Sequence, residues 1–147
     1  MGEFWLGNRF LHSITNQGSY ELMVNLTDFD GLSAYAHYNV FGVGDADSKY
    51  LLTVSGFSGD AGDGLEYNNK HPFSTQDRDH DVYSDINCAV REKGAWWYVS
   101  CSFSNLNGVY HHHGEHITSA LDGVFWRHWR GYDYSLRSTT MSVRRRN

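Results

Sequence analysis

The chain has 147 residues, which fits one domain with a sizeable core, and it has no apolar run of about 18 residues that could span a membrane. Its 5 Trp, 10 Tyr and 8 Phe residues, with 15 Gly and 1 Pro, argue against disorder and suit an aromatic, turn-rich α+β or β fold. The net charge is −5, and neither the acidic first half nor the nearly balanced second half is basic enough to predict a nucleic-acid surface.

The first 57 residues predict one short helix and a small sheet. Apolar residues at helical spacing predict an amphipathic helix over Glu3–Ile14. Alternating or β-rich composition then predicts three strands, separated by turn residues, at Tyr20–Phe29, Ser33–Val43 and Tyr50–Phe57. Together these strands indicate an antiparallel meander.

Residues 58–88 are rich in Gly, Asp, Asn and Ser and show little periodicity, which predicts a long loop region. Within it, Asp77, Asp79 and Asp81 place a carboxylate at every second position, so a folded-back loop could direct them at one Ca²⁺ while backbone carbonyls complete the shell. An EF-hand is excluded, because its Gly and Glu positions, counted from Asp77, hold Val and Cys. The spacing alone leaves a calcium loop of another architecture and a plain solvated loop open.

Cys88 and Cys101 lie 13 positions apart and are the two cysteines of the chain. Without a C-x-x-C motif or partners at zinc spacing, they favour a disulfide over a metal site, provided that the compartment is oxidising. The segment His112–His116 fits the zinc-protease pattern H-x-x-E-H, but Gly114 disfavours the helix that this pattern requires. No nucleophile elbow, P-loop or dinucleotide fingerprint occurs, so the sequence does not predict an enzyme.

Two further motifs have alternative interpretations. The segment Asn25–Thr27 is an N-glycosylation sequon inside a predicted strand, where an unmodified strand residue is an equal alternative. The basic tail Arg144–Arg146 favours a solvated terminus over a polyanion-binding patch, because three charges give only a small counterion-release term.

Eight segments, taken in order along the chain, resemble the fibrinogen C-terminal domain family, which includes fibrinogen, ficolins, tachylectins, tenascins and angiopoietins. They are GEFWLGN (2–8), YELMVNLTDFDG (20–31), YLLTVSGFSGDAGD (50–63), FSTQDRDHD (73–81), NCAV (87–90), GAWWY (94–98), SNLNG (104–108) and YSLRSTTMSVR (134–144). The resemblance therefore extends over essentially all of the chain.

The resemblance implies an α+β fold in which residues 1–57 and a C-terminal strand form a twisted antiparallel sheet with short helices. Residues 58–133 would form a loop-rich region that binds calcium and ligand. The family domain normally has a further N-terminal subdomain before the GEFWLGN segment, where this chain begins. We therefore expect residues 1–147 to be one such domain without that subdomain.

The resemblance also implies a calcium site and a disulfide. The side chains of Asp79 and Asp81 match the family's Ca²⁺ ligands, with backbone carbonyls expected from about Tyr83 and Asp85. Two further features are implied near the end of this region: a disulfide between Cys88 and Cys101, and a cis peptide bond before Cys101. The aromatic block Trp96–Tyr98 is expected to build the core around the disulfide.

The ligand pocket of the family corresponds to five residues of this chain, namely Glu92, Ser102, Phe103, Ala120 and Leu121. Ficolin-like pockets typically have His in place of Ser102 and Tyr in place of Ala120, so two features of acetyl capture are missing. Glu92 falls where the fibrinogen hole has a carboxylate, while Leu121 replaces its second acid. Phe103 and the histidines at 111–113 could supply other contacts, and Glu92 and Ser102 could equally be unliganded surface residues.

The function that the resemblance implies is a secreted, calcium-dependent, lectin-like recognition domain of innate immunity. It would bind microbial carbohydrate or a related non-self surface. The alternative is a protein-interaction or structural module that binds a peptide or a receptor. We expect no nucleic-acid partner and no membrane insertion, and homo-oligomerisation is left open.

Overall fold

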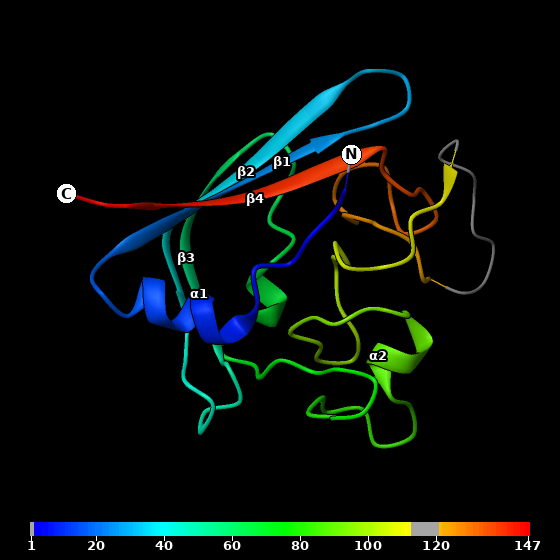
Figure 1. The fold of residues 1–147 in the computed structure, drawn as a ribbon. Helices are drawn as coiled ribbons and strands as arrows, with labels where there is room; N and C mark the ends of the chain where they lie inside the picture. Colours follow the sequence, from blue (N-terminus) through cyan, green and yellow to red (C-terminus); the bar gives the residue numbers. More distant parts are fainter. Residues whose placement is uncertain (1, 113–120) are drawn as a thin grey trace.

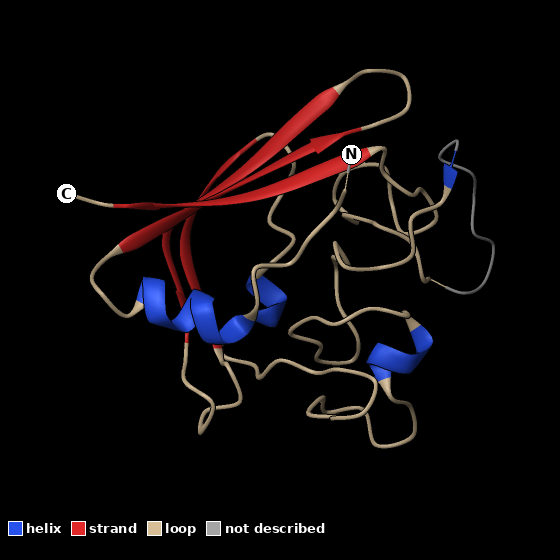
Figure 2. Cartoon of the chain, in the orientation of Figure 1, coloured by secondary structure: helices blue, strands red, loops and turns tan. Residues whose placement is uncertain are grey.

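A computed structural model describes residues 2–112 and 121–147. Within them, a four-stranded antiparallel sheet has the strand order β3-β2-β1-β4 (Figure 1), formed by β1 (Tyr20–Thr27), β2 (Ser33–Val43), β3 (Leu52–Gly59) and β4 (Ser138–Arg145). The first three strands are the predicted meander, and the C-terminal strand joins them beside β1. Between β3 and β4, the described residues form loops with short helices (Figure 2).

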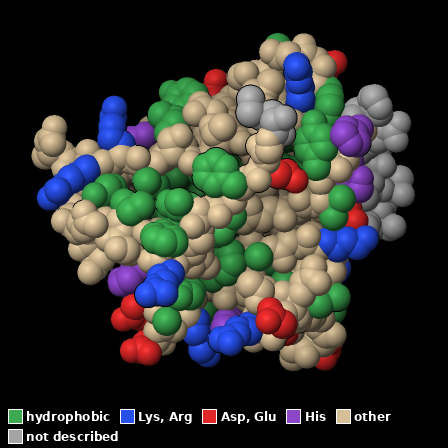
Figure 3. Space-filling model, viewed as in Figure 1, with side chains coloured by type: hydrophobic (Ala, Val, Ile, Leu, Met, Phe, Trp, Pro, Cys, Tyr) green, Lys and Arg blue, Asp and Glu red, His purple; other side chains and the backbone are tan. Residues whose placement is uncertain are grey.

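The helical elements of the described residues are α1 (Asn8–Thr15), the 3₁₀ helix η1 (Glu66–Asn68) and α2 (Cys88–Arg91). The predicted start of the first helix at Glu3 is wrong, because Gly7 directly before α1 has a φ of 96°, outside the helical region. Apolar side chains also reach the surface of this part of the protein (Figure 3), and Phe4 and Phe10 are 89% and 63% exposed.

The turn that follows β1 is organised by Asp28, which is fully buried. Its Oδ1 accepts hydrogen bonds from the backbone N–H groups of Asp30 at 2.9 Å and Leu32 at 2.8 Å, so β1 ends at Thr27 rather than at the predicted Phe29. Its Oδ2 accepts hydrogen bonds from both Nε and Nη2 of Arg130. This ion pair between the buried Asp28 and the exposed Arg130 ties the sheet to the loop-rich region.

The start of β3 also differs from the prediction. The strand begins at Leu52, because Lys49 and Tyr50 have φ values of 59° and 57° and so interrupt the extended backbone. The backbone N–H of Gly44 donates to the carbonyl of Leu51 at 2.8 Å and closes the connection between β2 and β3.

The hydrophobic core extends from one face of the sheet into the loop-rich region. Leu22, Val24 and Leu26 of β1 are fully buried on that face. They belong to the same cluster as Leu65 and the tryptophans of the loop-rich region, so the loops are packed against the sheet. Within residues 2–112 and 121–147, no helix is both long and apolar enough to cross a membrane.

Candidate functional site

The cysteine pair and the aromatic block form the rigid centre of the loop-rich region. Cys88 and Cys101 are joined in a disulfide with Cα atoms 5.5 Å apart, and the Ser100–Cys101 peptide bond is cis, as predicted. Trp96, Trp97 and Tyr98 are fully buried, with the two indole rings 5.2 Å apart in an edge-on arrangement. The prediction that this block builds the core is confirmed.

Asn105 connects the segments around this centre. It is fully buried, its Oδ1 accepts a hydrogen bond from the Tyr98 hydroxyl at 2.5 Å, and its Nδ2 donates to the carbonyls of Glu92 at 3.0 Å and Gly123 at 3.1 Å. A buried amide that bonds one hydroxyl and two backbone carbonyls holds these groups in place, because each would otherwise remain unpaired. The SNLNG segment therefore positions Glu92.

The acidic loop brings two of its three alternating carboxylates together. Asp79 Oδ1 accepts the N–H of Asp81 at 3.1 Å, and the two oxygens of Asp81 accept the N–H groups of Tyr83 and Cys88, both at 2.8 Å. The side chain of Asp77 instead accepts a hydrogen bond from the hydroxyl of Thr75 at 2.6 Å. Among the described residues, no three His, Cys, Asp or Glu side chains converge as a metal cluster.

The environment of Asp81 fits a bound cation. Burial raises the pKa of Asp81, and the neighbouring Asp79 carboxyl raises it further. Two interacting carboxyl groups favour a shared proton or a cation between them. The carbonyls of Tyr83 and Asp85, which the sequence names as further ligands, belong to the loop that directly follows Asp81. Carboxylates combined with backbone carbonyls are the oxygen donors that Ca²⁺ takes.

A short covalent and hydrogen-bonded path joins the acidic loop to Glu92. The Asp81 carboxylate accepts a hydrogen bond from the N–H of Cys88, and Cys88 is the first residue of α2. Glu92 follows the last residue of α2, and its own N–H donates to the carbonyl of Cys88 at 2.8 Å. Anything that moves the Asp81 carboxylate therefore acts on the helical turn that carries Glu92.

Glu92 is a buried acid with an incomplete set of partners. Its side chain is almost fully buried, with Oε1 3.3 Å from Nη2 of Arg91, while Oε2 has no hydrogen-bond partner among the described residues. Burial raises the pKa of Glu92 to about 8, and Arg91 offsets only part of this effect. A buried polar atom without a partner is rare in folded proteins and calls for a physical explanation.

Aromatic and cationic side chains lie near Glu92. The Tyr132 hydroxyl has a raised pKa, caused mainly by burial, with electrostatic contributions that include Arg127 and Glu92. The guanidinium of Arg127 lies 4.8 Å from the ring centre of Phe103 and 5.4 Å from that of Tyr132. The ring of Phe103 in turn stacks on Tyr67 at 4.6 Å. These five residues, Tyr67, Glu92, Phe103, Arg127 and Tyr132, are called the Glu92 cluster below.

The other residues predicted for the pocket have different surroundings. Ser102 is buried, and its Oγ accepts hydrogen bonds from Nδ2 of Asn68 at 2.9 Å and from the N–H of Ser104 at 3.1 Å, so its hydroxyl oxygen is committed to the protein. Leu121 is half-buried with a φ of 50°, and Ala120 lies outside the described residues. Glu115 and His116 of the H-x-x-E-H pattern also lie outside them.

The neighbour of Leu121 is part of an ion-pair cluster. The Asp122 carboxylate is almost fully buried and lies 3.1 Å from Nζ of Lys93 and 3.1 Å from Nε2 of His111. These contacts fix the start of the segment that leads to Trp126. One of the histidines expected near the pocket thus pairs with a buried acid.

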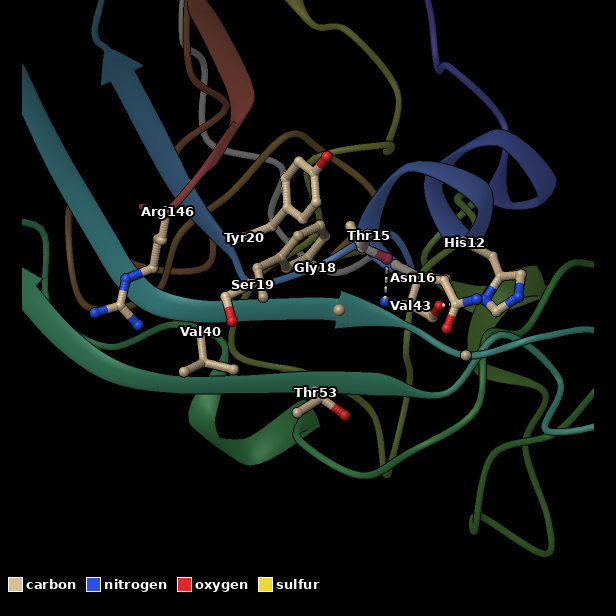
Figure 4. A pocket seen from close by; sticks show the side chains of 13 residues that line it. His12, Thr15, Asn16, Gly18, Ser19, Tyr20, Val40, Val43, Thr53 and Arg146 are labelled. Carbon is tan, nitrogen blue, oxygen red and sulfur yellow. Dashed lines mark hydrogen bonds between the residues drawn. The ribbon is translucent and has the colours of Figure 1, made fainter.

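A groove of about 350 Å³ lies elsewhere, between the end of α1, β2 and the C-terminal residues (Figure 4). Its lining includes His12 and Thr15, whose side chains bond the backbone of Val43 at 2.9 and 3.1 Å. Arg146 lines the other end. The groove contains none of the residues that the sequence predicted as a binding or metal site.

Residues 1–146 match the family model described as "Fibrinogen beta and gamma chains, C-terminal globular domain". The chain belongs to this family. Its members are non-enzymatic binding modules, in agreement with the absence of a catalytic prediction. The predicted fold class is also confirmed, since the sheet and the packed loops match solved fibrinogen-like domains.

Several relatives share most of this chain. Angiopoietin-related protein 6 of Homo sapiens is 46% identical over 97% of the chain and 30% of the relative. Its solved fibrinogen-like globe domain has a TM-score of 0.96 at 45% identity, covering 99% of this chain and 65% of that one. Fibrinogen C domain-containing protein 1 of Mus musculus is 48% identical over 97% of the chain and 32% of the relative.

A third similar protein was solved with a peptide. The structure "Fibrin D-Dimer, Lamprey complexed with the peptide ligand Gly-His-Arg-Pro-amide" has a TM-score of 0.89 at 33% identity, covering 96% of this chain and 50% of that one. This chain spans about a third of the length of angiopoietin-related protein 6 and of fibrinogen C domain-containing protein 1.

The sequence named the acidic pair, the two cysteines and Glu92, of which the structure confirms the disulfide, and it did not indicate Tyr67, Arg127 or Tyr132. Arg127 carries a weak sequence signal, because it directly follows the tryptophan of the D-G-x-x-W motif. Tyr67 and Tyr132 carry no signal, since each lies in a Gly- and Asp-rich stretch far along the chain from Glu92. Only the folded backbone brings these side chains together.

Proposed function

We propose that this chain is an extracellular, calcium-supported recognition domain that binds carbohydrate of microbial or other non-self surfaces at the Glu92 cluster. The observation that carries the proposal is the buried Glu92 side chain, whose Oε2 has no partner among the described residues. Leaving a buried polar group unpaired costs about 1–3 kcal/mol. A ligand that supplies the missing partner would recover this free energy on binding.

The protonation of Glu92 favours a neutral, oxygen-rich ligand. With a pKa of about 8, its carboxyl group is mostly protonated at neutral pH and can donate a hydrogen bond. Hydroxyl and carbonyl oxygens of sugars are suitable acceptors. The half-buried rings of Phe103, Tyr67 and Tyr132 add apolar faces on which a sugar ring can pack.

Calcium has a supporting role in this proposal. Asp79 and Asp81 would hold Ca²⁺ with their side chains, and Tyr83 and Asp85 would hold it with their carbonyls. When bound, the ion would neutralise two adjacent carboxylates and so fix the loop. Asp81 also accepts a hydrogen bond from the N–H of Cys88. A loop fixed by calcium would therefore also fix the helical turn that positions Glu92.

A peptide amine is the second candidate ligand. An incoming ammonium group would favour the ionised form of Glu92 and pair with it through a charge-assisted hydrogen bond. The lamprey fibrin structure, which was solved with a peptide that has glycine at its N-terminus, supports this alternative by its likeness to the chain. Carbohydrate binding therefore uses the neutral form of Glu92, whereas peptide binding uses its ionised form.

An array that displays glycans and peptides with free N-termini tests both candidates. The wild-type chain would be compared with Glu92→Gln, Glu92→Ala and the exposed control Glu66→Gln, in calcium and in EDTA. The glutamine variant stays neutral and keeps an N–H donor, so it should retain carbohydrate binding, whereas Glu92→Ala should lose it. Binding of peptides alone, lost in Glu92→Gln, would replace the carbohydrate proposal with the peptide alternative. Binding that no Glu92 variant alters would refute both.

A further inference from the structure

Asn25 lies on the sheet face opposite the core, near the C-terminal end of the inner strand β1. Its neighbours in sequence, Val24 and Leu26, are fully buried, whereas Asn25 itself is exposed. Its cross-strand partners are Tyr35 on β2 and Thr140 on β4, which share its face of the sheet. The structure therefore presents the Asn25 amide to solvent.

Asn25 also begins the sequon Asn25–Thr27, the single N-x-[ST] match in the 147-residue sequence. We propose that Asn25 carries an N-linked glycan, attached while the chain enters the secretory pathway. This inference rests on the extracellular location proposed above. In the transfer, the side-chain amide nitrogen bonds to the anomeric carbon of a lipid-pyrophosphate-linked oligosaccharide. The bond from that carbon to the pyrophosphate breaks, the lipid pyrophosphate leaves with the electron pair, and the amide loses one proton.

The order of synthesis leaves Asn25 accessible to the transferase. Within the sheet, β1 is covered on one side by β4, whose first residue, Ser138, is made 113 residues after Asn25. At about 5–20 residues per second, this takes roughly 6–23 s. Throughout that interval the sequon cannot be held between its two final neighbours, so the extended segment can enter the enzyme.

The folded sheet has room for the glycan. The outward residues around Asn25 on the two neighbouring strands are mostly small and polar, namely Ser33, Ser138, Thr140 and Ser142. The Tyr35 ring is 42% exposed directly across from Asn25, where the first sugar could pack against it. No hydrogen bond within the described residues uses the Asn25 side chain, so attachment would break none.

This position separates the glycan from the Glu92 cluster. Asn25 faces away from the core, whereas the Glu92 cluster is built from the loop-rich region between β3 and β4. A glycan on the outer sheet face would hinder protein contacts there and leave ligand binding unaffected. The face around Asn25 would thus be solvent-exposed in the mature protein.

The test is to express the full chain in mammalian cells behind a cleavable signal peptide, so that entry into the secretory pathway does not depend on the proposed location. Intact mass is measured before and after peptide-N-glycanase treatment, which converts a glycosylated Asn25 to Asp. Most molecules of the wild-type chain and of Thr27→Ser should carry a removable glycan. Asn25→Gln and Thr27→Ala should carry none, and Asn39→Gln, an exposed asparagine outside any sequon, should behave as wild type.

Two outcomes would overturn the inference. One is an unmodified Asn25 in wild-type chain recovered from the medium or from the secretory compartments of the cells. The other is a removable glycan that persists in Asn25→Gln. Neither outcome bears on ligand binding at Glu92, so failure here is distinguishable from failure of the proposed function.

Discussion

Replacing Glu92 with Gln is expected to change how the stability of the domain depends on pH. The Glu92 side chain is almost fully buried, and burial raises its pKa to about 8. In the unfolded chain the same carboxyl group returns to its usual pKa of about 4.3. Between these two values the folded protein keeps a proton that the unfolded chain has released.

This difference fixes the sign of the pH dependence. When the folded state binds one more proton than the unfolded state, the free energy of unfolding falls as pH rises, by up to about 1.36 kcal/mol per pH unit. The contribution of Glu92 is fully present below about pH 4.3 and is lost as pH rises through the folded pKa of about 8. Because glutamine does not titrate, Glu92→Gln should gain about 3–4 kcal/mol over wild type between pH 5 and pH 8.

Urea unfolding followed by tryptophan fluorescence measures this difference. The wild type, Glu92→Gln and the exposed control Glu66→Gln would be compared at pH 5, 6, 7 and 8 in EDTA, so that calcium does not contribute. The difference between wild type and Glu92→Gln should grow with pH, and the control should follow wild type. A difference that stays constant within about 1 kcal/mol would show that Glu92 is ionised in the folded protein and would refute this reasoning.

Three further outcomes are expected. Asp28→Ala should lower the free energy of unfolding by about 3 kcal/mol in urea, because two turn N–H groups lose their fully buried acceptor and Arg130 loses its nearest carboxylate. Changing the 76% exposed Asp30 to Asn should cost under about 0.5 kcal/mol. Equal effects of the two changes would contradict the role of the buried Asp28 carboxylate. Asp79→Ala should abolish a calcium-dependent rise in Tm in differential scanning calorimetry, and an unchanged rise would exclude the acidic pair as the calcium site. Asn105→Ala should cost about 2–4 kcal/mol in urea because three buried partners lose their hydrogen bonds, and a loss below about 1 kcal/mol would show that those partners find others.

The sheet could be predicted because its signals are local. Burial in β1 alternates around Leu22, Val24 and Leu26, and turn residues separate the strands, so three strands could be placed from the sequence. The helix start and two strand ends could not, because they depend on the backbone conformation of Gly7 and Tyr50 and on the turn formed by the Asp28 side chain.

The site was only partly predictable for a different reason. The acidic pair and the cysteines lie in compact motifs, so spacing and resemblance identified them. Tyr132 lies within electrostatic range of both Glu92 and Tyr67, which come from different loops, and no sequence pattern encodes this arrangement. Ser102 shows the converse, since its position matched a pocket residue while its hydroxyl oxygen is committed to Asn68 and Ser104.

Isothermal titration calorimetry of the strongest carbohydrate from the array, in calcium, tests the central claim most directly. Wild type, Glu92→Ala and Glu66→Gln would be titrated with the same sugar. Loss of the Glu92 hydrogen bond should weaken binding by about 1.5–3 kcal/mol, which corresponds to a Kd roughly 10–150-fold higher, while the control keeps the wild-type Kd. Equal Kd values for wild type and Glu92→Ala would contradict the claim that the buried carboxyl group of Glu92 binds the ligand.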